Sequence, residues 1–291
     1  MAGDERRIGE KMSGKTGRKG MEKIIQEIYE KLKEIENKEN VRILHAVESG
    51  SRAWGFASPD SDYDVRFIYV RPAEEYLRLD EPRDVIEWQL DEVLDINGWD
   101  LKKAMKQFAR GNATLFEWSN SPEVYHTTDQ WAQVQRVSMN YFSEKSAVGH
   151  YYGLAENTYR DYLCQELVSY KKYFYALRPL LAARYIERFH QVPPVRFADL
   201  LGVEPGEELQ EGIARLLERK RLTGEKERMP HMPVILRYIE EELQRQREIV
   251  KRLPDDHNRD WGELNRCFRA VMGYGVRDAS SASWGKQNHD R

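Results

Sequence analysis

Hydrophobic residues along the chain are spaced first as in a helix, then as in short strands, and then as in helices again. Within residues 21–40 they recur every three or four positions, which predicts a helix with one apolar face. Short apolar runs bounded by turn residues come next and predict strands, and a helical repeat follows them. The strands are expected at about 41–47, at 62–70 and, as a pair, within 83–98, and the helix at about 100–110.

Beyond Pro122 the character of the chain changes. From about 129 to 273 the apolar spacing is helical nearly throughout, with interruptions at Pro193-Pro194 and near Gly224. The pattern therefore predicts an α+β fold, in which a small mixed β-sheet domain precedes an all-helical domain. The expected divisions are a disordered tail, the sheet domain, the helical domain and a flexible tail, at 1–20, 21–128, 129–273 and 274–291.

The composition excludes several classes of protein. No apolar run approaches the roughly 20 residues of a membrane-spanning helix, and the first residues lack the apolar core of a secretory signal. Cys164 and Cys267 form neither a disulfide framework nor a zinc motif, so we expect a cytoplasmic protein without a membrane partner. The net charge of -3 argues against a surface that binds nucleic acid all over, but not against a local basic cleft.

The segment 45–70 carries the candidate chemistry. A buried strand leads into Gly50 and Ser51, and after ten intervening residues the next strand opens with Asp62 and Asp64. Two carboxylates two residues apart on a strand point to the same face, where a hard divalent cation such as Mg²⁺ would offset their repulsion. A Gly-Ser turn offers backbone N–H groups to an anion. Together these features favour phosphoryl or nucleotidyl transfer with two metal ions.

This joint pattern resembles the DNA polymerase beta-type nucleotidyltransferase superfamily, in which a Gly-Gly or Gly-Ser turn is followed by an Asp–apolar–Asp/Glu–apolar motif. Tyr63 and Val65 occupy the apolar positions here. Longer segments within about 43–186 further resemble the YcgL/RlaP-type branch of predicted nucleotidyltransferases, which is associated with RNA repair. These segments are GSRAWGFASPDSDYDVRF, LDINGWDLKKAM, GNATLFEWSNSP and YKKYFYALRPLLAARYI.

The resemblance implies that three carboxylates bind the catalytic Mg²⁺ or Mn²⁺ ions. Asp62 and Asp64 are two of them, and the third is expected on a later strand. Asp95 is the preferred candidate, because its strand leads directly into the helix at about 100–110. Glu87 also lies between two apolar residues and is the alternative, although an outward-facing acid on an edge strand has the same pattern.

The remaining candidate residues belong to the nucleotide side of the reaction. The resemblance implies that Gly50 and Ser51 hold the triphosphate. Arg52 follows the turn and could clamp a phosphate, or it is an ordinary surface arginine. A further set shares one helical face and consists of Lys171, Tyr175 and Arg178. Its cations could neutralise a triphosphate and its ring could stack on a base, whereas a solvated basic face with a core tyrosine is the alternative.

These assignments predict a metal-dependent nucleotidyltransferase. It would move a nucleoside monophosphate from an NTP to an acceptor hydroxyl or phosphate, and the resemblance suggests an RNA end, such as that of a tRNA, in RNA repair. A protein side chain and a small molecule stay open as acceptors. The alternative is a non-catalytic module with the same fold that senses a nucleotide or acts as an antitoxin-like partner. A third hypothesis, an RNA-binding scaffold, is disfavoured by the net charge of -3.

Overall fold

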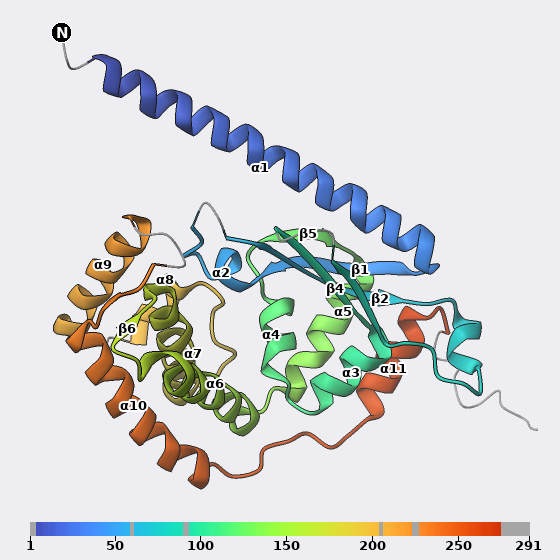
Figure 1. The fold of residues 1–291 in the computed structure, drawn as a ribbon. Coiled ribbons are helices and arrows are strands. Elements are labelled where there is room, and N and C mark those ends of the chain that lie inside the picture. Colours follow the sequence, from blue (N-terminus) through green and yellow to red (C-terminus); the bar gives the residue numbers. More distant parts are fainter. Residues whose placement is uncertain (1–3, 59–60, 90–92, 204–205, 223–226, 275–291) are drawn as a thin grey trace, which may run out of the picture.

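The computed structural model covers most of the chain and describes residues 4–58, 61–89, 93–203, 206–222 and 227–274. The flexible tail expected at 274–291 therefore lies outside the described residues, except for Tyr274. Figure 1 shows a sheet with helices on both of its faces and a group of further helices beside it.

The sheet has five strands in the order β3-β4-β2-β1-β5, with β2 and β4 parallel and the other neighbours antiparallel. The strands are β1 (Arg42–Ser49), β2 (Tyr63–Val70), β3 (Val85–Gln89), β4 (Leu94–Asp100) and β5 (Val124–Thr127). The four strands expected from the sequence are confirmed. The fifth, β5, is an edge strand whose side chains are mostly exposed, so it has no apolar pattern that would predict it.

The second half of the helix α1 (Asp4–Glu39) covers one face of the sheet (Figure 1). Its apolar stripe packs on β2 and β4 through Ile28, Leu32 and Ile35. This stripe is the helical face expected within 21–40. Helix begins as early as Asp4, however, where the sequence predicted a disordered tail up to residue 20. That stretch mixes Glu, Lys and Arg, which have good helix propensity, with four glycines, which have poor helix propensity, so its composition gave no clear helical signal.

The opposite face of the sheet is covered by four shorter helices, as Figure 1 shows. They are α3 (Leu101–Ala109), α4 (Ala113–Ser119), α5 (Asp129–Ser138) and α11 (Gly262–Val271). The first of them is the helix expected at about 100–110, and the carboxylate of Asp100 caps it by accepting the backbone N–H of Lys102 at 2.7 Å. The α+β fold is therefore confirmed.

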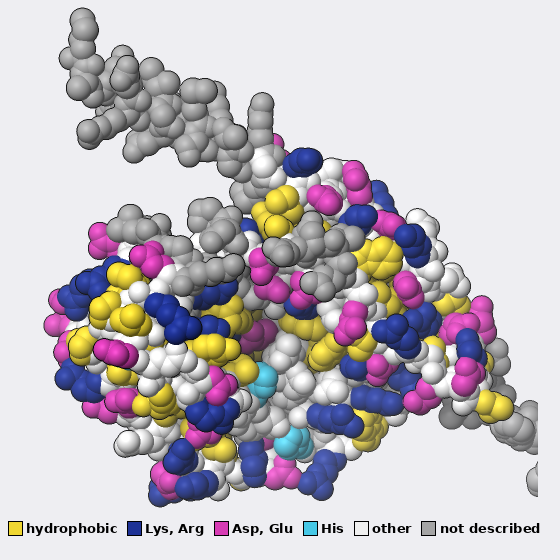
Figure 2. Space-filling view, viewed as in Figure 1, with side chains coloured by type: hydrophobic (Ala, Val, Ile, Leu, Met, Phe, Trp, Pro, Cys, Tyr) yellow, Lys and Arg dark blue, Asp and Glu magenta, His cyan; other side chains and the backbone are white. Residues whose placement is uncertain are grey.

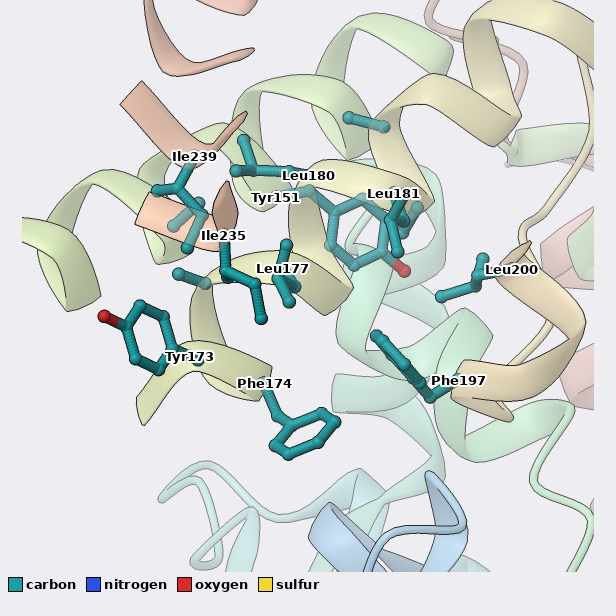
Figure 3. Packing of buried hydrophobic residues seen from close by; sticks show 14 of the residues in the cluster. Tyr151, Tyr173, Phe174, Leu177, Leu180, Leu181, Phe197, Leu200, Ile235 and Ile239 are labelled. Carbon is teal, nitrogen blue, oxygen red and sulfur yellow. The ribbon is translucent and has the colours of Figure 1, made fainter. Parts of the chain in front are cut away.

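A helical bundle forms the other part of the molecule. Its helices are α6 (Glu144–Thr158), α7 (Tyr170–Phe189), α8 (Phe197–Leu200), α9 (Glu207–Leu222) and α10 (Pro233–Arg252). Figure 3 shows how side chains of α6, α7, α8 and α10 interlock in its core, with Leu177 of α7 near the centre. The strands β6 (Leu167–Val168) and β7 (Met229–Pro230) pair at one end, although the sequence indicated no strand beyond 129.

The packing groups the helices differently from their order in sequence. The helix α11 follows the bundle in sequence but packs beside α3 and α5, and Leu264 and Cys267 are buried there with Trp131 of α5. Both α5 and α11 lie within the helical domain expected at 129–273, yet their apolar faces belong to the core under the sheet. The chain thus leaves the bundle after α10 and returns to the sheet (Figure 1).

Short elements complete the described chain. They are the one-turn helix α2 (Gly50–Ala53), the 3₁₀ turns η1 (Ala73–Leu77), η2 (Met139–Tyr141) and η4 (Leu201–Val203), and the π-helical turn η3 (Tyr159–Leu163). Among the described helices, none combines the length and the hydropathy needed to cross a lipid bilayer.

Candidate active site

The turn between β1 and β2 requires a glycine at position 50. Gly50 has a φ of 62°, in the left-handed region that side chains disfavour, and it opens α2 directly after β1. A Cβ atom at this position would lie 2.1 Å from Oδ2 of Asp64. The turn and the carboxylate are therefore in direct contact, which brings the first two parts of the expected motif together.

The second pair of expected residues is brought together by the sheet. In the parallel pairing of β2 with β4, Asp64 lies directly opposite Asp95, so their side chains leave the same face of the sheet. Arg66 lies two residues further along β2, on that same face. Its Nη2 donates to Oδ1 of Asp64 at 3.1 Å and to Oδ2 of Asp95 at 2.7 Å. One guanidinium group thus joins two of the three acids.

The environment of Asp64 disfavours its negative charge. Burial raises the pKa of this carboxyl, and the neighbouring charges of Asp95 and Asp62 raise it further, whereas the cations Arg66 and Lys171 lower it. Asp62 itself is exposed and directly precedes β2. A set of carboxylate oxygens whose negative charges crowd one another fits a hard divalent cation, which would remove the repulsion.

The register of the sheet supports Asp95 over Glu87 as the third acid. Glu87 lies opposite Asn97, so it occupies the same face of the sheet but the next strand outward from β4. Its side chain is exposed there, as expected for the outward-facing acid of an edge strand. Asp95, by contrast, shares Arg66 with Asp64.

Glu48 is a residue of the site that the sequence analysis did not single out. Its side chain is buried in β1, and Oε1 accepts the backbone N–H of Asp64 at 2.8 Å. The hydroxyl of Tyr125, on β5, donates to the other oxygen. Burial raises the pKa of Glu48 to about 7. An acid directly after the apolar residues Ala46 and Val47, two residues before the turn, was the available signal.

Arg52 and Ser51 lie at the turn, but their side chains are engaged by the protein and are not open to a ligand. Arg52 donates from Nε to the carbonyl of Asp62 at 3.0 Å and from Nη2 to the carbonyl of Ser61 at 2.6 Å. Its guanidinium group also stacks 3.6 Å from the ring centre of Tyr63. These contacts hold the loop that carries Asp62. Ser51 is buried as well.

The start of α7 approaches the acids from the bundle. Lys171 is close enough for its charge to lower the pKa of Asp64. Tyr175, one turn further on, meets the ring of Trp54 edge-on, with 5.4 Å between ring centres. Trp54 directly follows α2, so these rings connect the turn at Gly50 to the helix that carries Lys171. Lys171 therefore lies near Asp64, and Tyr175 contacts the residue that follows the turn at Gly50.

Arg178 has a different position from the one expected. Its side chain is 3% exposed, and its Nη1 donates to Oε1 of Glu117 at 2.8 Å while Nε and Nη2 donate to the carbonyl of Val195. A triphosphate could reach this guanidinium group only if these bonds broke. Tyr151 of α6 also donates to Glu117, at 2.8 Å. The ion pair therefore docks α4 of the sheet part against α6 and α7, rather than offering a cation to a nucleotide.

A separate cluster of possible metal ligands lies far along the chain. In the described part of the structure, Asp255, Asp256 and His257 have ligand atoms within 4.8 Å of one another. Asp256 accepts the hydroxyl of Ser143 and the backbone N–H of Glu144, at the start of α6. Hydrogen bonding to His257 lowers the pKa of Asp255. The contacts of Asp256 therefore give the cluster a structural role, in which it caps the N-terminal end of α6.

Comparison with known proteins places the chain in a family. A sequence profile of the RNA repair pathway DNA polymerase beta family, RlaP, matches residues 24–270. The chain belongs to this family. It is also similar to the uncharacterized protein YcgL of Bacillus subtilis (strain 168), with 42% identity over 247 residues, which make up 84% of this chain and 94% of that protein. The resemblance inferred from the sequence motifs is confirmed.

The RlaP match includes both parts of the molecule. It begins within α1 and ends within α11, so it spans the turn at Gly50, the acids on β2 and β4, and the start of α7. The returning helix α11 is therefore part of the RlaP unit and not an appendage to it.

Proposed function

We propose that this RlaP-family chain is a divalent-metal-dependent nucleotidyltransferase that moves a nucleoside monophosphate from an NTP to an acceptor hydroxyl or phosphate. The strongest support is the position of Asp64, which lies opposite Asp95 across two parallel strands and in contact with the turn at Gly50. Acids that lie this close to the N-terminal end of a one-turn helix suit a ligand that combines a cation with phosphate groups.

In this proposal, Asp62, Asp64 and Asp95 hold Mg²⁺ or Mn²⁺, which supplies Lewis-acid stabilisation of the charge that develops on the phosphates. Asp95 is half exposed, so its carboxylate can also accept the proton of an attacking hydroxyl. Glu48 fixes the backbone of Asp64 from the other side of the strand, because its buried carboxylate accepts that residue's N–H.

The nucleotide is proposed to lie between the turn and α7. Backbone N–H groups of Gly50 and Ser51 are in the first turn of α2, where a helix supplies no partner of its own, and they would bind the triphosphate. Lys171 would neutralise phosphate charge, and the paired rings of Trp54 and Tyr175 would receive the base. Arg52 would act by holding the loop at Asp62 instead of binding phosphate.

We propose an RNA end, of the kind found in tRNA, as the acceptor, on the basis of the RNA repair pathway in the family's name. Positive and negative side chains are interspersed over the face seen in Figure 2, so RNA contact would be local to the site. In this proposal residues 21–128 supply the acids, and 129–273 supply the nucleotide-binding helix α7 together with α11, which supports the sheet. We further propose that the reaction takes place in the cytoplasm.

The test is a transfer assay with each α-³²P-labelled NTP and Mg²⁺ or Mn²⁺, in the presence and absence of total tRNA. We expect label to move to RNA, and Asp64→Asn to reduce the rate by at least about 100-fold, because a neutral amide cannot replace a metal-binding carboxylate. Asp84→Asn is the matched control, since this acid pairs with Lys103 near the opposite end of β4. Undiminished transfer by Asp64→Asn would contradict the proposal.

A nucleotide sensor without catalysis is the second candidate. It is favoured by one observation, the ion pairs of Arg66 with Asp64 and Asp95, which offset part of the repulsion between these acids in a folded chain without a metal ion. The same assay separates the two functions. Metal-dependent NTP binding without label transfer to RNA, protein or small molecules would identify the sensor.

A further inference from the structure

Arg66 lies beside two of the acids that are proposed to bind metal. Its Nη2 donates to one oxygen of Asp64 and to one oxygen of Asp95, on neighbouring strands. Its Nη1 donates to the backbone carbonyls of Val65 and Asp95, at 3.1 and 3.2 Å. The side chain is 17% exposed, so the guanidinium group is held mostly within the protein and screened little by water.

The two carboxylates explain why a cation is needed there. Asp64 and Asp95 lie side by side on parallel strands, and their like charges raise the free energy of the metal-free fold. A guanidinium group that donates to both acids offsets this repulsion with one positive charge. A divalent cation would offset it with two, but it requires lone pairs of the same oxygens.

We propose that Arg66 is a positioning residue that serves as an internal counter-cation of Asp64 and Asp95 and competes with the divalent cation for them. The inference rests on the metal site of the proposed function. Full coordination of both carboxylates requires Nη2 to leave at least one of them. The two bonds from Nη1 to backbone carbonyls keep the guanidinium group beside the site when that happens. Arg66 therefore stabilises the metal-free fold and lowers the affinity for metal.

The test compares Mn²⁺ binding by calorimetry to the full chain after removal of metal, in the wild type, Arg66→Gln and Arg66→Lys. We expect Arg66→Gln to bind Mn²⁺ about tenfold more tightly, because no charged hydrogen bond has to be broken. Its melting temperature without metal should fall, and Mn²⁺ should raise it by more than in the wild type. Arg42→Gln is the matched control. It also removes one arginine, but at the start of β1, opposite Val70 and away from the acids, and it should behave as the wild type.

The outcomes separate this inference from the proposed function. If Asp64→Asn abolishes Mn²⁺ binding while Arg66→Gln binds Mn²⁺ no more tightly than the wild type, the role of Arg66 is wrong and the metal site stands. If Mn²⁺ binding does not depend on Asp64, the proposed metal site is wrong and the inference fails with it. Should Arg66→Gln not fold, Arg66→Lys decides, because a lysine lacks the fork that reaches both strands. It should bind Mn²⁺ more tightly than the wild type, and equal affinity would overturn the inference.

Discussion

Gly50 shows how a single residue determines the geometry of the site. Two separate constraints act on it, a left-handed backbone and the carboxylate of Asp64 where a Cβ would lie. Glu48 and Arg66 act on the same aspartate, the first through its backbone N–H and the second through its side chain. The position of Asp64 is therefore fixed by three neighbours before any ligand binds.

Gly50→Ala should displace Asp64 as well as strain the turn. We expect the free energy of unfolding to fall by about 1–3 kcal/mol and Mn²⁺ affinity and NMP transfer to fall together, because the new methyl group occupies the space of Oδ2. Gly55→Ala is the matched control, since Gly55 also has a positive φ, 83°, but has open space where a Cβ would lie. Equal loss of Mn²⁺ affinity in both variants would contradict the contact argument.

His45 should make stability depend on pH. Burial lowers its pKa to about 4, and its ring stacks on Trp131 with 4.7 Å between centres. Between pH 6.5 and 4 the unfolded chain binds a proton that the folded chain resists, so the contribution of His45 to the free energy of unfolding falls as pH falls, by about 3 kcal/mol. Relative to the wild type, His45→Gln should gain stability between pH 6.5 and pH 4, which urea unfolding at the two pH values measures. An unchanged difference between the two proteins would contradict this role of His45.

At the scale of elements, the side chains of β2 alternate between a face that packs in the core and a face that carries the acids of the site. One set of side chains, including Val65 and Phe67, faces α1, and the other set contains Asp64 and Arg66. Helix α7 divides its length in a similar way. Its start reaches the site with Lys171, and Arg178, two turns later, is buried as part of the joint with α4.

The ion pair between Arg178 and Glu117 should hold α4 and α7 together. Arg178→Met leaves the carboxylate of Glu117 buried without its cation, so we expect the free energy of unfolding to fall by about 3 kcal/mol. Glu117→Gln should also destabilise the chain, and the double variant should lose less than the sum of the two. Denaturant unfolding of the three variants measures this coupling. Additive losses would show that the pair does not join the two helices.

At the scale of the whole molecule, the chain connects the sheet part and the helical bundle twice. The chain enters the bundle after α5 and returns through α11 to the core that contains Trp131 and Leu264. The ion pair at Glu117 and the rings at Trp54 connect the parts a second time, beside the site. Changes in either part are therefore expected to reach the acids.

Leu264→Ala should loosen the sheet part, although Leu264 follows the bundle in sequence. Its side chain is buried, and we expect a loss of about 3 kcal/mol from the cavity that it leaves. Hydrogen exchange should increase in α3 and α5. Ile239→Ala, at a buried position of α10, should instead increase exchange in α6 and α7. A response of the bundle alone to Leu264→Ala would contradict the packing of α11 under the sheet.

The sequence alone determined the parts that depend on local pattern. The apolar runs predicted β1 to β4, because a buried strand needs consecutive apolar residues, and the stripe within 21–40 predicted the packed part of α1. The Gly-Ser turn and the acids were readable because their spacing is itself the motif. Asp95 was preferred over Glu87 for its place before α3, and the register supports that choice.

Only the tertiary structure decided which residues meet across long stretches of chain. It buried Arg178 against Glu117, which lies 61 residues earlier, although helical spacing had grouped it with Lys171. It added the exposed strand β5, returned α11 to the sheet, and brought Arg66 between two acids 31 residues apart in sequence. Spacing along the chain cannot specify such contacts, because they depend on how separate elements pack. The arginines and buried acids of the site therefore acquire their roles from partners that only the fold supplies.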